Sequence, residues 1–207
     1  MANTYTQTLD PQYSTNHTLT FAGLIIWFCM VLWFSLTGSY IVPEGQPPLF
    51  LILSLSIPVL AFAIAYNFSS SFKHYALNLD IRTLILLHSW RMLGFGFLFI
   101  YAFSQLPLMF ALPAGVGDAI AAIFATVIGI AFIINKHGVK KKWISLWNSF
   151  GLMDFGIAVS MGLINRTGNI GHLENTIASD ALSHFPLGMS PGIIVPFFLL
   201  IHFFIIF

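Results

Sequence analysis

Long apolar stretches separated by short polar segments dominate the chain. Six of them approach or exceed the roughly 20 residues that a helix needs to cross a bilayer. They cover residues 19–42, 49–66, 81–104, 118–135, 143–164 and 185–207. The pattern therefore predicts an all-α polytopic membrane protein with six transmembrane helices.

Composition supports this class. Hydrophobic residues make up 57% of the chain and charged residues only 7%, whereas a soluble domain carries about 25% charged residues. The formal net charge of +1 and the lack of a basic stripe argue against a nucleic-acid partner, and the single cysteine excludes a disulfide framework. We expect residues 1–18 to form a polar cytoplasmic tail and residues 19–207 to form one six-helix transmembrane domain embedded in the lipid bilayer.

The segments between the apolar stretches predict further features. Residues 67–80 mix apolar and polar positions and fit a short interfacial helix. Residues 106–118 are rich in Pro and Gly but too apolar for an ordinary loop, which indicates a broken or re-entrant turn at the membrane surface. Helices three–four and five–six are candidate hairpin repeats, because Trp90 precedes Gly94 as Trp147 precedes Gly151, and a proline-bearing turn follows each pair.

Positive charge predicts the orientation. With six helices, the loops after the second and fourth helices lie on the same side of the membrane as both termini. That side holds most of the cationic side chains, namely Lys73, Arg82, Lys136, Lys140, Lys141 and Lys142. The other side holds Arg166. Because cytoplasmic loops carry an excess of Lys and Arg, both termini are expected in the cytoplasm.

Two opposite charges fall within the expected membrane helices. Counting from Arg82 to Arg91 and from Trp143 to Asp154, at about 1.5 Å per residue, puts both charges near the midplane. A charge there costs about 3 kcal/mol on insertion scales. We therefore expect an Arg91–Asp154 ion pair, with Asn148 beside it, either as a solute or proton site or as a structural salt bridge.

Asp118 follows the sequence GVG at the expected start of the fourth helix. The favoured interpretation is an N-cap, whose carboxylate accepts backbone N–H bonds and complements the helix dipole. The alternative is that Asp118 reaches Arg91 or an incoming cation.

Two histidines form a second candidate site. His88 and His202 are expected at similar depths on different helices. Facing imidazoles can ligate a haem iron, or a metal ion with further ligands. The alternative is that each hydrogen-bonds a backbone carbonyl or the Arg–Asp cluster.

Three segments carry a family resemblance: RMLGFGFLFIYAFSQLPLMFALPAGVGD, WNSFGLMDFGIAVSMG and FPLGMSPGIIVPFFLLIHF. Over about residues 88–207 the chain resembles an uncharacterised family of small six-helix bacterial integral membrane proteins with no known activity. The resemblance implies a bacterial inner membrane location. It also implies that one shared site contains Arg91, Gly115, Gly117, Asp118, Asn148, Gly151, Asp154 and His202.

These observations favour one function and leave two others open. We expect binding or transport of a small polar or anionic solute, or of protons, with Arg91, Asp154, Asn148 and Asp118 lining the site. The alternatives are a b-type haem redox protein that uses His88 and His202, and a structural accessory subunit of a larger membrane complex or homo-oligomer. A membrane enzyme stays open as well, although no nucleophile–base arrangement is readable.

Overall fold

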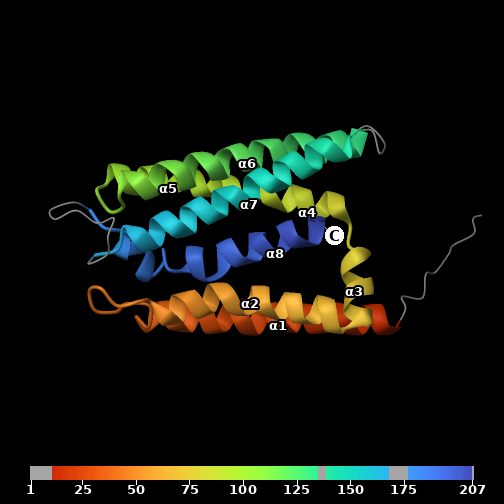
Figure 1. Cartoon of the computed structure of the whole chain (residues 1–207), viewed down its shortest axis with the longest axis horizontal. Coiled ribbons are helices and arrows are strands. Elements are labelled where there is room, and N and C mark those ends of the chain that lie inside the picture. The colour runs from red at the N-terminus through yellow and green to blue at the C-terminus, as the bar shows by residue number, and fades with distance from the viewer. Residues whose placement is uncertain (1–10, 135–138, 168–176, 207) are drawn as a thin grey trace, which may run out of the picture.

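Helices that run roughly along one axis make up the computed structural model (Figure 1), which describes residues 11–134, 139–167 and 177–206. All regular secondary structure in these ranges is helical. The elements are α1 (Pro11–Leu36), α2 (Leu49–Phe68), α3 (Ser70–Leu77), α4 (Ile81–Leu87), the 3-10 helix η1 (His88–Phe95), α5 (Gly96–Ala102), α6 (Leu108–Ile134), α7 (Lys141–Ile164), the 3-10 helix η2 (Ser179–Ser183), the π-helical turn η3 (Ser190–Ile194) and α8 (Val195–Ile206).

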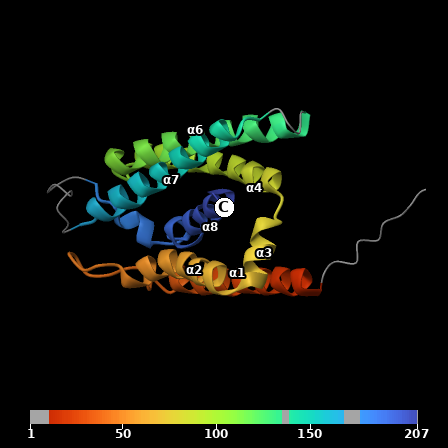
Figure 2. The ribbon, with the colours of Figure 1, turned by 45° about the vertical axis from the view of Figure 1, so that its right-hand side comes forward.

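The helices form two groups with α8 between them (Figures 1 and 2). α1 and α2 lie side by side in one group, and α4, η1, α5, α6 and α7 form the other. α8 packs against α2 on one side and against α4 and α7 on the other. It therefore connects the two groups.

Within the described residues, four helical segments, rather than the expected six, are both long and apolar enough to span a membrane. They are Ser14–Leu36, Leu49–Phe68, Ile81–Ala102 and Leu108–Ile134. α7 is long, but Asn148 and Asp154 lie among its buried residues, and such polar side chains lower its hydropathy. The last apolar helix runs only from Ser190 to Ile206, because its expected first turns are not α-helical.

α1 is displaced toward the N-terminus relative to the expected 19–42. Its helix covers residues 11–18, which we expected in the polar tail, whereas residues 1–10 lie outside the described residues. It ends earlier because Gly38 has a φ of +72° and the Ser39 amide donates to the Phe34 carbonyl at 2.9 Å. A left-handed glycine with this backbone bond is a common helix ending.

The turn expected over residues 106–118 is wrong from Leu108 onward, where the chain is helical. α6 begins at Leu108, and its first turn is anchored by the Ala111 amide, which donates to the Pro107 carbonyl at 2.9 Å. Pro113 lies inside the helix. A helix satisfies nearly all backbone groups in apolar surroundings, so one internal proline is tolerated there. As a result Asp118 lies well inside α6 and is not an N-cap.

The third expected helix is interrupted at its centre by η1. A 3-10 helix has three residues per turn, so side chains at i and i+3 eclipse. His88, Arg91 and Gly94 are therefore aligned on one face of η1. Trp147 and Gly151 lie in the uninterrupted α7, so the two halves of the proposed repeat differ in local structure.

The short helix expected within residues 67–80 is present as α3. Its N-cap is Ser69, whose hydroxyl accepts from the Phe72 amide at 3.2 Å. α4 is capped in turn by Asp80. The Thr83 hydroxyl donates to Asp80 Oδ2 at 2.8 Å, and this hydrogen bond holds the pKa of the Asp80 carboxyl below its usual range.

Candidate functional site

Arg91 is the centre of a buried polar cluster in which every guanidinium nitrogen has a partner. Nε donates to Asp118 Oδ1 at 2.7 Å, and Nη2 donates to Asp154 Oδ2. Nη1 lies 3.1 Å from His202 Nε2. The Arg91 side chain is only 1% exposed, and its guanidinium carbon lies 3.9 Å from the ring centroid of Phe155.

The expected Arg91–Asp154 ion pair is therefore confirmed as a contact. The preferred interpretation of Asp118 is wrong, and its alternative holds: the α6 helix carries Asp118 to Arg91. The cluster draws one ionisable side chain from each of four elements, because Arg91 lies in η1, Asp118 in α6, Asp154 in α7 and His202 in α8.

Asn148 fixes the protonation of His202. The side-chain amide of Asn148 donates to the His202 carbonyl at 3.3 Å, which leaves Asn148 Oδ1 as an acceptor 2.7 Å from His202 Nδ1. His202 Nδ1 therefore carries the proton, and Nε2 accepts from the Arg91 guanidinium. The ring is thus a neutral acceptor that adds no charge beside the arginine.

Three glycines make room for the cluster. A Cβ on Gly117 would overlap the Asp154 carboxylate, and a Cβ on Gly94 would overlap that of Asp118. A Cβ on Gly151 would overlap the His202 ring and would lie 3.0 Å from Arg91 Nη1. Gly115 lies to one side, where a Cβ would come within 3.1 Å of Leu98.

His88 and His202 are adjacent, as expected, but their geometry does not fit a haem. Their ring centroids are 4.1 Å apart, so the rings are in contact and no macrocycle can lie between them. Both ring nitrogens of His202 are already occupied by Arg91 and Asn148. No group of three or more His, Cys, Asp or Glu suited to a metal ion occurs within the described ranges.

His88 is fully buried and is held by its ring contacts. Its centroid lies 5.0 Å from the ring centroids of Trp147 and Phe198. Within the part of the chain that the structure describes, neither ring nitrogen has a hydrogen-bond partner. Within the described residues, His88 therefore packs against other rings and forms no hydrogen bond with the Arg–Asp cluster.

The ionisable groups in contact with Arg91 do not balance its charge. Two carboxylates, Asp118 and Asp154, face adjacent nitrogens of one guanidinium, and His202 is neutral. If both carboxylates are ionised, the buried cluster carries a net charge of −1. An unbalanced charge in a low-dielectric interior is costly, so the site favours taking up one proton or one cation.

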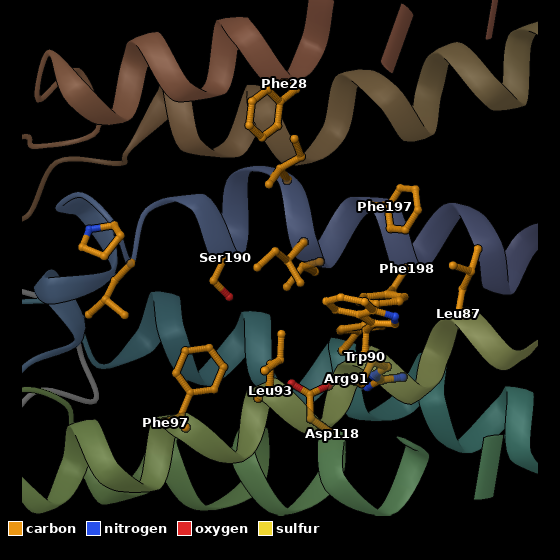
Figure 3. Close-up of a pocket in the computed structure, with 18 of the residues that line it drawn as sticks. Phe28, Leu87, Trp90, Arg91, Leu93, Phe97, Asp118, Ser190, Phe197 and Phe198 are labelled. Carbon is orange, nitrogen blue, oxygen red and sulfur yellow. Dashed lines mark hydrogen bonds and ion pairs between the residues drawn. The ribbon is translucent and has the colours of Figure 1, made fainter. Parts of the chain in front are cut away.

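Two cavities meet at Asp118. The larger is a groove of about 730 Å³ between α1, η1 and the η3–α8 segment, and Arg91 and Asp118 lie on its floor (Figure 3). The smaller, of about 120 Å³, is lined by Asp118 and also by Arg166, just beyond the end of α7. Asp118 is 15% exposed and Asp154 is 6% exposed, so Asp118 is the more accessible carboxylate.

Comparison with known proteins gives a family. Residues 48–207 match the model of a domain of unknown function, DUF8737. The chain belongs to this family. The DUF8737 region begins further toward the N-terminus than the resemblance expected from residue 88, and it contains the whole Arg91 cluster. No curated protein and no solved structure matches the chain.

Several features of this site have no clear signal in the sequence. The groove is formed partly by α1, which precedes the matched region, and Phe28 and Trp90 in its wall gave no signal in an aromatic-rich chain. The sequence indicates Gly94 only as part of the candidate repeat. Its position three residues after Arg91 would have been informative had the 3-10 geometry been known.

Two glycines of α7 provide a matched test of this packing. We expect Gly151→Ala to destabilise the protein by about 1–3 kcal/mol, because the new methyl group overlaps His202 and crowds Arg91. Gly156→Ala should be neutral or stabilising by up to about 1 kcal/mol, because a Cβ there meets nothing within 4 Å and alanine favours a helix. Unfolding free energies in mixed detergent–SDS micelles would measure both changes, and equal effects would contradict the packing.

The ion pairs predict non-additive mutations. Arg91→Ala should destabilise the protein by about 3–5 kcal/mol, because it leaves buried carboxylates without a counter-charge. The same substitution should cost less in an Asp154→Asn background, and least when Asp118→Asn is also present. A double-mutant cycle on unfolding free energies measures this coupling, and strictly additive costs would exclude it.

Proposed function

We propose that this protein spans a membrane and that its Arg91 cluster is an intramembrane site that binds and releases one proton. The observation that carries this proposal is the burial of one arginine between two carboxylates. Arg91 cannot lose its own proton, and His202 is a neutral acceptor. A proton on Asp118 or Asp154 is therefore the simplest way to balance the charge.

The same contacts favour a proton over an anionic solute. Each guanidinium nitrogen of Arg91 already has a partner. An anion could bind Arg91 only by displacing a carboxylate, which would leave that carboxylate buried without its counter-charge. A proton avoids this cost, because it neutralises one carboxylate without displacing it from Arg91.

The smaller cavity supports an access route to the site. It is lined by Asp118 and by Arg166. Arg166 lies at the end of α7 opposite Lys141, where its Nη1 donates to Ser183 Oγ at 2.7 Å. Protons would exchange between Asp118 and this end of the bundle. A site connected in this way is suited to proton-linked transport.

Infrared spectroscopy of the purified protein tests the proposal. Between about pH 5 and 9 exposed carboxyl groups stay ionised, so a carbonyl band that appears on acidification reports a buried carboxylic acid. We expect the wild type to show this band. Asp118→Asn and Asp154→Asn should each abolish it, because either substitution leaves one carboxylate paired with Arg91.

Glu44→Gln is the control, because Glu44 is an exposed carboxylate in the turn between α1 and α2. This variant should keep the band. A wild-type spectrum without the band, a band that does not change with pH, or a band that persists in both Asp→Asn variants would overturn the proposal.

We also propose that the chain crosses a bacterial inner membrane six times, with α7 and the η3–α8 segment as the two less apolar or shorter crossings. Both run alongside the four candidate spans (Figure 1). α3 and the starts of α4 and α7 lie at one end of the bundle, and they bring Lys73, Arg82 and Lys140–142 there. Lys136 lies outside the described residues. From the positive-inside rule we then expect both termini in the cytoplasm.

Cysteine labelling in intact cells tests this topology. In a Cys29→Ser background, Gln46→Cys should react with a membrane-impermeant maleimide, because Gln46 lies at the expected outer end. Lys141→Cys should react only after the cells are permeabilised. Both positions are exposed, so the opposite labelling pattern would reverse the orientation, and equal labelling of both would contradict an odd number of crossings between them.

A further inference from the structure

We propose that the groove beside Asp118 binds a lipophilic cation, meaning an apolar molecule that carries one amine or other positively charged group, in exchange for the proton. This inference rests on the proposed function, because the carboxylate that receives the cation is the one that carries the proton. It adds the chemical class of the ligand and the place where the ligand lies.

The size and walls of the groove fit an apolar body. Its volume of about 730 Å³ lies in the range of about 300–1,000 Å³ that small-molecule sites occupy. Aromatic side chains come from three sides, with Phe28 on α1, Trp90 and Phe97 on the η1–α5 segment, and Phe197 and Phe198 on α8 (Figure 3). Aromatic faces bind cations as well as apolar groups.

The groove is also accessible from the lipid. Trp90 and Leu93 line it and are 67% and 71% exposed. Ile25 lines it from α1 and is 61% exposed. An apolar molecule dissolved in the bilayer would therefore enter sideways, without crossing a polar surface.

The charge on the floor selects a cation. Among the described residues that line the groove, Arg91 and Asp118 are the ionisable ones. The Arg91 guanidinium is fully engaged, whereas Asp118 uses Oδ1 for Arg91 and its Oδ2 accepts no hydrogen bond within the described residues. Of these two ionisable groups, the unpaired polar atom at the groove is therefore Asp118 Oδ2. It is a negatively charged hydrogen-bond acceptor, which attracts a cation and repels an anion.

Proton and ligand exclude one another at this site. Asp118, Asp154 and Arg91 together carry one excess negative charge, and one positive charge neutralises it. A bound cation therefore replaces the proton, and one proton leaves for each singly charged ligand that binds. A neutral apolar ligand has no such effect, because the site keeps its proton.

The test uses the purified full-length chain in detergent, with tetraphenylphosphonium as the cationic probe and triphenylphosphine oxide as a neutral probe of related shape. We expect equilibrium dialysis to show saturable binding of the cation that weakens as the pH falls. In weakly buffered solution, binding should release about one proton per cation. Asp118→Asn should weaken cation binding at least about tenfold, and Glu44→Gln should leave it unchanged.

Adjacent isoleucines on α1 provide a control that leaves the charged cluster intact. Ile25 lines the groove, whereas Ile26 does not, and the two are 61% and 69% exposed. Ile25→Trp should fill part of the groove and weaken binding of the cation several-fold. Ile26→Trp should have no effect, because its side chain points elsewhere on α1.

The outcomes separate this inference from the proton proposal. Equal binding of the two probes, or cation binding that survives Asp118→Asn, would show an unselective apolar groove filled by detergent or lipid and would overturn the inference. A carboxylic acid band without any cation binding would leave the proton site standing and overturn only the ligand class. Cation binding without that band would overturn the proton exchange.

Discussion

The charge of Arg91 is the constraint on which the rest of the core depends. A guanidinium stays charged at any physiological pH, so a buried arginine must find acceptors for its donors and at least one counter-charge. Arg91 finds them on α6, α7 and α8. Because each of these helices supplies a different acceptor, the position of the arginine fixes three helices relative to η1 at once.

The backbone around the cluster is adapted to the same constraint. The 3-10 geometry of η1 aligns Arg91 with Gly94, so that the residue one turn after the arginine leaves space for Asp118. Gly117 and Gly151 do the same for Asp154 and His202. Small residues let helices approach closely, and here the space gained is filled by polar side chains.

The sequence predicted the helical class from its long apolar stretches. It predicted the Arg91–Asp154 contact because the rise per residue gives the position of each charge along its helix, and few charges lie at the same level. It failed at Asp118, because Pro and Gly normally mark turns, whereas an apolar setting favours a continuous helix through Pro113. The 3-10 segment had no signal, since His88–Phe95 fits either helix type. The ring contact between His88 and His202 depends on side-chain packing, which spacing alone does not encode.

The two carboxylates differ in a way that assigns them different roles. Asp154 is 6% exposed and lies against Gly117, so its position is fixed by backbone contact. Asp118 is 15% exposed and lines both cavities. The third acceptor, His202, is neutral and adds no further negative charge. In the function that we propose, Asp154 therefore stays the counter-ion of Arg91, and Asp118 is the group at which one positive charge is exchanged for another.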